Sequence, residues 1–420
     1  MRNDVRRCRA LVLVAAVLAL LGKLALAITT YGTNDITHWL DFLHGVRQSG
    51  PIGIYSYPFT NSLYNHPPLI GYYLEMVGVL THVGLTPQFT IRAVASLADV
   101  VTDVVVFAMV ARRRSLREAT AAGIIVALSP ILIIISGFHG NTDPIFTMLT
   151  LLSVYLLADR QRPTLAGGAM ALAVGIKIVP VVAVPCLLIY ALRRGRSVFA
   201  RFAAACAVVS AVFWLPALIE QLPAIRRNVL GYSGVNAHEW GIDLLGAWAG
   251  HPAWARFMEG SGRLLIVAAC AIVPAYLAWR RPQMIAEAVC LALAAFLALT
   301  PTFGTQYLAW GAAAVFLLSF RSAVIFNVLG GLLLIHVYNR WSSGLPWYHA
   351  HAGPFTPGEN VFGLLVWASL CCAVVFGAVR MFQAPSEVPT ARQPSGPAAR
   401  AEVAQPVPAS AAHSEVRAIS

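Results

Sequence analysis

Charged residues are scarce in this sequence. Asp, Glu, Lys and Arg make up only 11% of the 420 residues, whereas about a quarter is usual in soluble domains. Apolar residues make up 58%, and the mean hydropathy is +0.69. The period-two alternation of spanning strands is missing, and apolar stretches of about 17 to 25 residues recur along the chain. The composition therefore excludes a water-soluble enzyme and predicts an all-α integral membrane protein.

Cysteine pairs and acidic pairs are missing as well. Of the seven cysteines only Cys8 lies outside the expected spans, and no C-x-x-C pair occurs. The loops expected on the outer side contain no D-x-D pattern of the kind that binds divalent cations. These absences exclude a disulfide framework outside the membrane, and we expect neither a metal ion nor a cofactor.

Basic residues are present in excess but are not gathered on one surface. The formal net charge is +12, yet the bursts of Arg and Lys stand between apolar runs, so nucleic acid is not an expected partner. They precede the first span and then fall at every second boundary, at residues 111–117, 159–162, 193–196, 280–281 and Arg321. This alternation follows the positive-inside rule and places those boundaries in the cytoplasm.

About twelve transmembrane helices fit this orientation. The expected spans are 10–28, 89–111, 118–137, 142–158, 164–179, 180–192, 198–218, 264–279, 284–300, 306–320, 322–338 and 361–380. An even number leaves both termini in the cytoplasm, and the plasma membrane is the expected location. The stretch at 67–80 is too short and is interrupted by Glu75, so we expect it to contribute to an interfacial or re-entrant helix pair on the outer face.

The long loops all fall on the outer side, at 29–88, 219–263 and 339–360. Residues 1–382 are therefore expected to form one polytopic catalytic domain. The tail from 383 to 420 is rich in Pro, Ala and Ser and is expected to be disordered and cytoplasmic. The first span, with "ALA" at 25–27, also resembles a signal peptide, so cleavage there remains open.

Polar residues collect at the outer ends of the spans and form the candidate site. Asp35, in "YGTNDITHWL", is the candidate catalytic residue. The candidate substrate-binding residues are Tyr64, His66, His139, Asp143, Lys177, His238, Gln306, Tyr307 and Arg340. Segments far apart in the sequence thus deliver acids, histidines, cations and aromatic rings to one depth.

The acids and Lys177 have structural alternatives. Asp35 and Asp143 are each followed by an expected helix and could cap it. Lys177 lies between apolar stretches, so it must either snorkel to the surface or meet an anion, and we favour the anion. An arginine inside a span, Arg92, is expected to pair with Asp99 or Asp103 and is left out of the site.

The aromatic residues and Arg340 have alternatives too. "TQYLAW", which contains Gln306 and Tyr307, could be part of an aromatic belt at the membrane surface. Arg340 stands beside Trp341, and this pairing is also typical of an interface anchor.

The candidate set suits displacement of a lipid-linked phosphate by a hydroxyl. A carboxylate would take the acceptor's proton, and one or two cations would hold the departing phosphate. The isoprenoid tail of such a donor needs an apolar groove, which a polytopic protein offers.

The order of these motifs resembles the GT-C superfamily of polytopic glycosyltransferases that use polyprenyl-phosphate sugars. The resemblance covers about residues 10 to 380. It rests on "TNDITHWLDF" after the first span, "YNHPPLIGYY", "RAVASLADVVTDVVVFAMV", the "HG" turn before the fourth span, Lys177 and "QYLAW". It implies an inverting transferase with Asp35 as base, Lys177 near the donor phosphate, mannose as the favoured sugar and a glycolipid or cell-envelope glycan as acceptor. Many members carry paired acids in the first loop, whereas here Asn34 precedes Asp35.

Two other classes remain as alternatives. A transporter or flippase for a lipid-linked or small polar substrate would use the same charges, but the tiny inner loops argue against alternating access. A membrane O-acyltransferase would use a histidine in a bundle but gives Lys177 no role. The oligomeric state is not indicated by the sequence.

Overall fold

The computed structural model describes residues 2–60, 62–232, 234 and 238–385. Most of this part of the chain is helical. The α-helices are α1 (Arg2–Thr29), α2 (Asn34–Gly53), α3 (Leu69–Thr81), α4 (Pro87–Ala111), α5 (Leu116–Ala127), α6 (Pro130–Ile134), α7 (Asp143–Val154), α8 (Pro163–Ile176), α9 (Val184–Arg194), α10 (Arg196–Ile225), α11 (Gly241–Trp248), α12 (Pro252–Phe257), α13 (Arg263–Arg280), α14 (Ile285–Leu299), α15 (Leu308–Leu318), α16 (Phe320–Trp341) and α17 (Pro357–Gln383).

Short turns of 3₁₀ or π-helix extend several of these helices. They are η1 (Ile54–Ser56), η2 (Ile135–His139), η3 (Tyr155–Asp159), η4 (Val179–Ala183), η5 (Arg226–Leu230), η6 (Met258–Gly262), η7 (Pro282–Met284) and η8 (Thr305–Tyr307). Two strands, β1 (Gly32–Thr33) and β2 (His349–Ala350), pair in parallel.

Within the described residues, eight helices are long and apolar enough to cross a bilayer. They cover 3–29, 87–111, 116–139, 196–230, 260–280, 282–299, 320–341 and 357–383. The other four expected spans are also helical, in α7, α8, η4 with α9, and α15, but these helices are shorter. The chain is thus an all-α multi-pass membrane protein, and the count of twelve spans stays a prediction.

Local sequence chemistry sets where several helices begin. Thr86 caps α4 by accepting a hydrogen bond from the Phe89 amide at 3.2 Å, with Pro87 in the first turn. Thr356 and Glu359 form a capping box at the start of α17, which also begins with a proline. These residues bind amide groups that have no partner inside the first turn of a helix.

The most apolar helices are found in the middle of the bundle. All the residues of α15 are buried, and α14 is buried along most of its length. By contrast, α10 packs on α8 and α9, and only 11% of its most apolar 18-residue stretch is buried inside the protein. A helix that is apolar all round suits either a protein core or lipid. The helices α14 and α15 are of the first kind, and the exposed surface of α10 suits the second.

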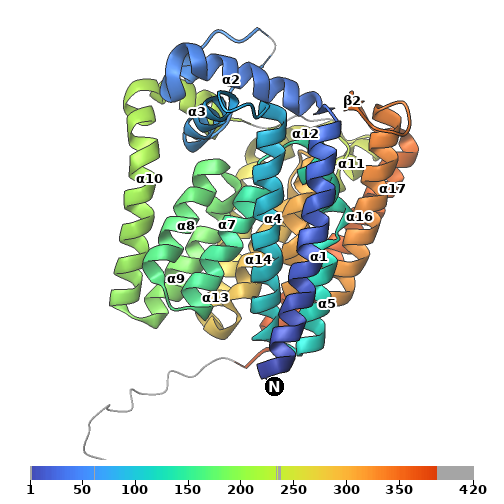
Figure 1. Cartoon of the computed structure of the whole chain (residues 1–420). Coiled ribbons are helices and arrows are strands. Elements are labelled where there is room, and N and C mark those ends of the chain that lie inside the picture. The colour runs from blue at the N-terminus through green and yellow to red at the C-terminus, as the bar shows by residue number, and fades with distance from the viewer. Residues whose placement is uncertain (1, 61, 233, 235–237, 386–420) are drawn as a thin grey trace, which may run out of the picture. The chain divides into compact units, whose positions relative to one another are not determined.

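One end of the bundle collects the basic turns. Arg113 forms a two-point ion pair with Asp159, at 3.0 and 3.1 Å. Arg114 and Arg380 both donate to the Leu317 carbonyl, at 3.0 and 2.7 Å. The ends of α4, η3, α15 and α17 therefore lie together, and α1 begins near this end (Figure 1).

The opposite end carries α2 and α3, which lie across the bundle (Figure 1). The β1–β2 ladder ties the segment after α16 to the start of α2, pairing Gly32 with His349 and Thr33 with Ala350. These two helices are the pair expected in the first loop, and their position relative to a bilayer stays a prediction.

Several sequence predictions need correction or fall outside the description. Among the described residues Arg92 forms no ion pair with an acid; it donates to Thr30 and to the Ala27 carbonyl, while Asp99 pairs with Lys23 at 2.6 Å. The guanidinium thus binds the orphan carbonyls at the end of α1. The expected loop 219–263 is largely helical, and α10 runs on to Ile225. Most of the tail predicted to be disordered, from residue 386, lies outside the described residues.

Candidate active site

A cavity of about 820 Å³ opens among the elements at the α2 and α3 end. Its walls come from α2, the segment after Ser62, the turn before α7, the start of η4, the start of α13, the 300–307 turn and the segment 352–355. Of the candidate residues, Asp35, His66, His139, Lys177, Gln306 and Tyr307 line it. Segments remote in sequence thus build one cavity.

Asp35 lies in the first turn of α2, and it does not cap that helix. The cap is Thr33, whose hydroxyl accepts from the Asp35 amide at 3.3 Å and donates to the His139 carbonyl at 3.0 Å. The Asp35 side chain is 32% exposed and lines the cavity. The capping alternative is therefore wrong for this residue.

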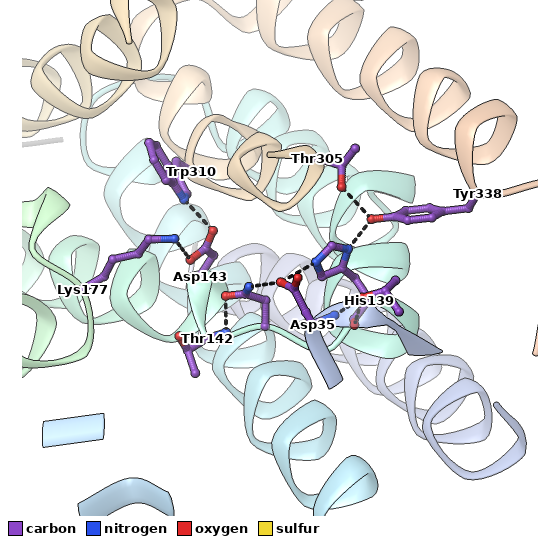
Figure 2. A network of polar contacts seen from close by, with 10 residues as sticks. Asp35, His139, Thr142, Asp143, Lys177, Thr305, Trp310 and Tyr338 are labelled. Carbon is purple, nitrogen blue, oxygen red and sulfur yellow. Dashed lines mark hydrogen bonds and ion pairs between the residues drawn. The ribbon is translucent and has the colours of Figure 1, made fainter. Parts of the chain in front are cut away.

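Two side chains hold one oxygen of Asp35 (Figure 2). His139 Nε2 lies 2.9 Å from Oδ2, and Asn141 Nδ2 donates to the same oxygen at 2.7 Å. The Asn141 amide is itself fixed, because its Oδ1 accepts from the Thr142 amide at 2.7 Å. Among the described residues no donor binds Oδ1, so this oxygen is left for a substrate.

The turn at residues 135–140 aims His139 at Asp35. The π-helical turn η2 ends at His139, and Gly140 follows with a φ of +83°. A Cβ at Gly140 would come within 2.3 Å of Ile36 Cδ1, so the position needs glycine for both backbone and space. His139 Nδ1 bonds the Tyr338 hydroxyl, which also bonds Thr305 at 2.9 Å. Insertions of this kind in helices often occur at functional sites.

The surroundings keep Asp35 ionised. Burial alone raises the pKa of its carboxyl, but the charge and hydrogen bond of His139, with the bond from Asn141, lower the pKa from 3.8 to about 2. An ionised carboxylate can only accept hydrogen bonds, so Nε2 of His139 carries the proton. Asp35 can therefore receive a proton from a bound hydroxyl.

Lys177 and Asp143 form a second polar group beside the first (Figure 2). Lys177 Nζ lies 2.6 Å from Asp143 Oδ1, and Trp310 Nε1 donates to Asp143 Oδ2 at 2.9 Å. The same ammonium faces the rings of Tyr307 and Trp310, at 4.6 and 5.2 Å from their centroids. The anion that Lys177 meets in the structure belongs to the chain itself, and Asp143 is wholly buried behind it.

Aromatic rings form the wall on the first-loop side. His66 stacks on Trp39 with 4.7 Å between ring centroids, and burial lowers its pKa to about 3. His66 is therefore neutral at physiological pH. Tyr64 is buried behind this wall, in edge contact with Phe42 and Tyr55, and does not line the cavity.

Two further candidate residues lie away from the cavity wall, in addition to Tyr64 and Asp143. His238 pairs with Asp243 at 2.8 Å. Arg340 binds both oxygens of Glu359, at 2.8 and 2.7 Å, and the Pro354 carbonyl at 2.9 Å. Arg340 therefore holds the 352–355 segment in place and is itself neutralised.

Several cavity residues were not singled out from the sequence, and Asn141 and Arg263 are the two that matter most for the chemistry. Asn141 stands inside the "HGNTDP" segment but looks like an ordinary turn residue. Arg263 lines the cavity at the start of α13. The sequence feature that could have identified it is its place at the outer end of an expected span, where the positive-inside rule disfavours a basic residue. Among the described residues no three metal-binding side chains lie together, and the absence of a metal stays a prediction.

Comparison with known proteins places the chain in a family. No curated protein matches it. Residues 72–287, slightly more than half of the chain, match the model of glycosyltransferase family 87. The matched range includes the "HG" turn, Lys177 and Arg263. Together with the apolar helices, this match shows that the chain belongs to glycosyltransferase family 87 and is a membrane glycosyltransferase.

Proposed function

We propose that this enzyme moves a hexose or pentose, with mannose favoured, from a polyprenyl-phosphate donor to a lipid-linked or cell-envelope glycan. The transfer inverts the anomeric carbon and takes place on the outer side of the plasma membrane. The donor class and mannose follow from the resemblance of the motif order to the GT-C superfamily. The family match favours a transferase over the transporter alternative.

The observation that carries the proposal is the state of Asp35. Its carboxylate lines the cavity, is ionised, and has both neighbouring donors on Oδ2, so that Oδ1 is open to a hydroxyl. A general base must reach the proton that it removes. Asp143 is a poor alternative base, because its two oxygens are bound by Lys177 and Trp310 and it is fully buried.

The reaction balances without a further reactant. The acceptor oxygen attacks the anomeric carbon, and its proton passes to Asp35. The bond between the anomeric carbon and the phosphate oxygen breaks, and polyprenyl monophosphate leaves with the electron pair. Because attack comes from the face opposite the phosphate, the configuration inverts.

The distribution of charge supports an outer site and cytoplasmic termini. The basic turns gather at one end of the bundle, where Arg113, Arg114 and Arg380 make their contacts. The cavity lies at the other end, under α2 and α3. By the positive-inside rule the basic end faces the cytoplasm.

Asp35→Asn tests the proposal. The amide keeps the shape of the side chain but cannot take the proton, so the rate of sugar transfer should fall by about 10²- to 10⁴-fold. Transfer is measured with the full-length protein in nanodiscs, with a radiolabelled polyprenyl-phosphate sugar and a glycolipid acceptor.

Asp41→Asn is the matched control. Asp41 lies in the same helix, accepts from Ser62 at 2.8 Å and does not line the cavity, so this variant should transfer at the parent rate. Parent activity in Asp35→Asn would mean that the base is another group.

A further inference from the structure

We propose that Arg263, and not Lys177, holds the phosphate of the lipid-linked donor. This inference rests on the proposed function and names the donor subsite within the same cavity. It departs from the sequence-based expectation that Lys177 lies against the phosphate.

The two other cations of the candidate set are already neutralised. Lys177 forms a 2.6 Å ion pair with Asp143, whose side chain has no exposed surface. Arg340 forms a two-point ion pair with Glu359, which is equally buried. Drawing either cation towards a phosphate would leave a buried carboxylate without its partner, which is costly.

Arg263 differs from both. It lines the cavity, and Nη1 donates to the Tyr232 carbonyl at 3.0 Å. Within the described part of the chain no carboxylate forms an ion pair with Arg263. A neutral carbonyl orients the guanidinium but leaves its charge and most of its N–H donors available, and planar guanidinium groups bind phosphate oxygens through paired hydrogen bonds.

The place of Arg263 suits an amphiphilic phosphate. On one side it lines the cavity, which also holds Asp35. On the other, the next two residues of α13, Leu264 and Leu265, are 66% and 61% exposed, and Leu230 at the end of η5 is 54% exposed. A phosphate at Arg263 would thus have its sugar in the cavity and its isoprenoid tail along apolar surface of the kind that meets lipid.

The position relative to Asp35 also suits the chemistry. Asp35 comes from α2 and Arg263 from α13, and Tyr232, whose carbonyl binds Arg263, lines the cavity with them. A sugar held between these two walls would present one face to the base and the other to the phosphate, as inversion requires. Arg263 lies at the end of the bundle away from the basic turns that contain Arg113, Arg114 and Arg380, where the positive-inside rule disfavours a basic residue.

The test compares binding of two lipids by the full-length protein in nanodiscs of zwitterionic lipid. One probe is a polyprenyl monophosphate, and the other is the polyprenol of the same length. The measured quantity is the ratio of their dissociation constants. The wild type should prefer the phosphate, and Arg263→Gln should reduce that preference by about 10- to 100-fold, as loss of a charge-assisted hydrogen bond implies. Arg263→Lys should retain part of it.

Two controls separate this site from its neighbours. Arg256→Gln removes an exposed arginine that does not line the cavity, and the phosphate preference should not change. The double variant Lys177→Met, Asp143→Asn replaces one neutral pair by another and should also keep the preference. Unchanged polyprenol binding in each variant shows that the protein is folded.

Two results would overturn the inference in distinguishable ways. In the first, the wild type prefers the phosphate, but Arg263→Gln keeps that preference or the double variant loses it. Arg263 is then not the phosphate ligand, and the proposed function stands. In the second, the wild type binds polyprenol as tightly as polyprenyl phosphate. The proposal that the donor is a polyprenyl-phosphate sugar is then wrong.

Discussion

At the scale of single residues, two aspartates of similar appearance in the sequence have different places. Asp35 keeps an oxygen open to the cavity, whereas Asp143 is enclosed by Lys177 and Trp310. The sequence could indicate that both acids lie at one end of the bundle. It could not choose between them, because the choice depends on which cation and which indole reach each carboxylate across the bundle.

His139 acts as a positioning residue, and the pH profile tests this. The pKa of Asp35 is lowered to about 2, so wild-type kcat/KM should show no acid limb from this residue above about pH 4. His139→Gln removes the charge and weakens the hydrogen bond, while the burial that raises the pKa remains. The acid limb should therefore move upward into the measurable range, and His82→Gln, an exposed residue outside the cavity, should leave the profile unchanged.

The same pair bears on stability with a definite sign. Because the folded pKa of Asp35 lies below its ordinary value of 3.8, the pairing stabilises the fold at pH values above 3.8 and this contribution is lost as the pH falls towards 2.

A uniform loss of activity in His139→Gln with no change in the shape of the pH profile of kcat/KM would show that the histidine does not act through Asp35.

At the scale of elements, the sequence predicts where helices lie but not how they are interrupted. Residues 118–137 read as one apolar span, yet Pro130 starts a separate helix and the last turn is π-helical. An inserted residue in a turn leaves the apolar pattern almost unchanged, so hydropathy alone cannot reveal it. The interruption matters because η2 is the element that delivers His139.

Close packing between α8 and α10 gives a prediction for one glycine. A Cβ at Gly167 would meet the Phe202 carbonyl oxygen at 2.2 Å, whereas a Cβ at Gly168 would meet nothing nearer than 4.0 Å. Gly167→Ala should therefore lower stability by about 1 to 3 kcal/mol through overpacking. Gly168→Ala should be neutral or slightly stabilising, because alanine favours helix. Equal melting temperatures of the two purified variants would contradict the packing described for these helices.

At the scale of the whole molecule, the distribution of basic residues predicts the orientation of the chain in the membrane. The candidate site lies at the end of the bundle opposite the basic turns. The sequence therefore predicts the side of the candidate site and six of the residues that line the cavity, among them Asp35, Lys177 and Tyr307. Tyr64, Asp143, His238 and Arg340 share that side but lie outside the cavity wall, whereas Arg263 is part of the wall. Their places depend on how α10 to α13 and the 352–355 segment fold over the bundle, which no local pattern encodes.

The most direct measurement follows both products of the wild-type reaction. The full-length protein in nanodiscs receives a polyprenyl-phosphate sugar labelled at the anomeric carbon, together with a glycolipid acceptor. NMR of the product gives the anomeric configuration, and chromatography gives the lipid released. The account predicts that polyprenyl monophosphate appears in an amount equal to the sugar transferred and that the configuration of the sugar is inverted. Retention of configuration, or transfer only from a nucleotide sugar without release of polyprenyl phosphate, would contradict it.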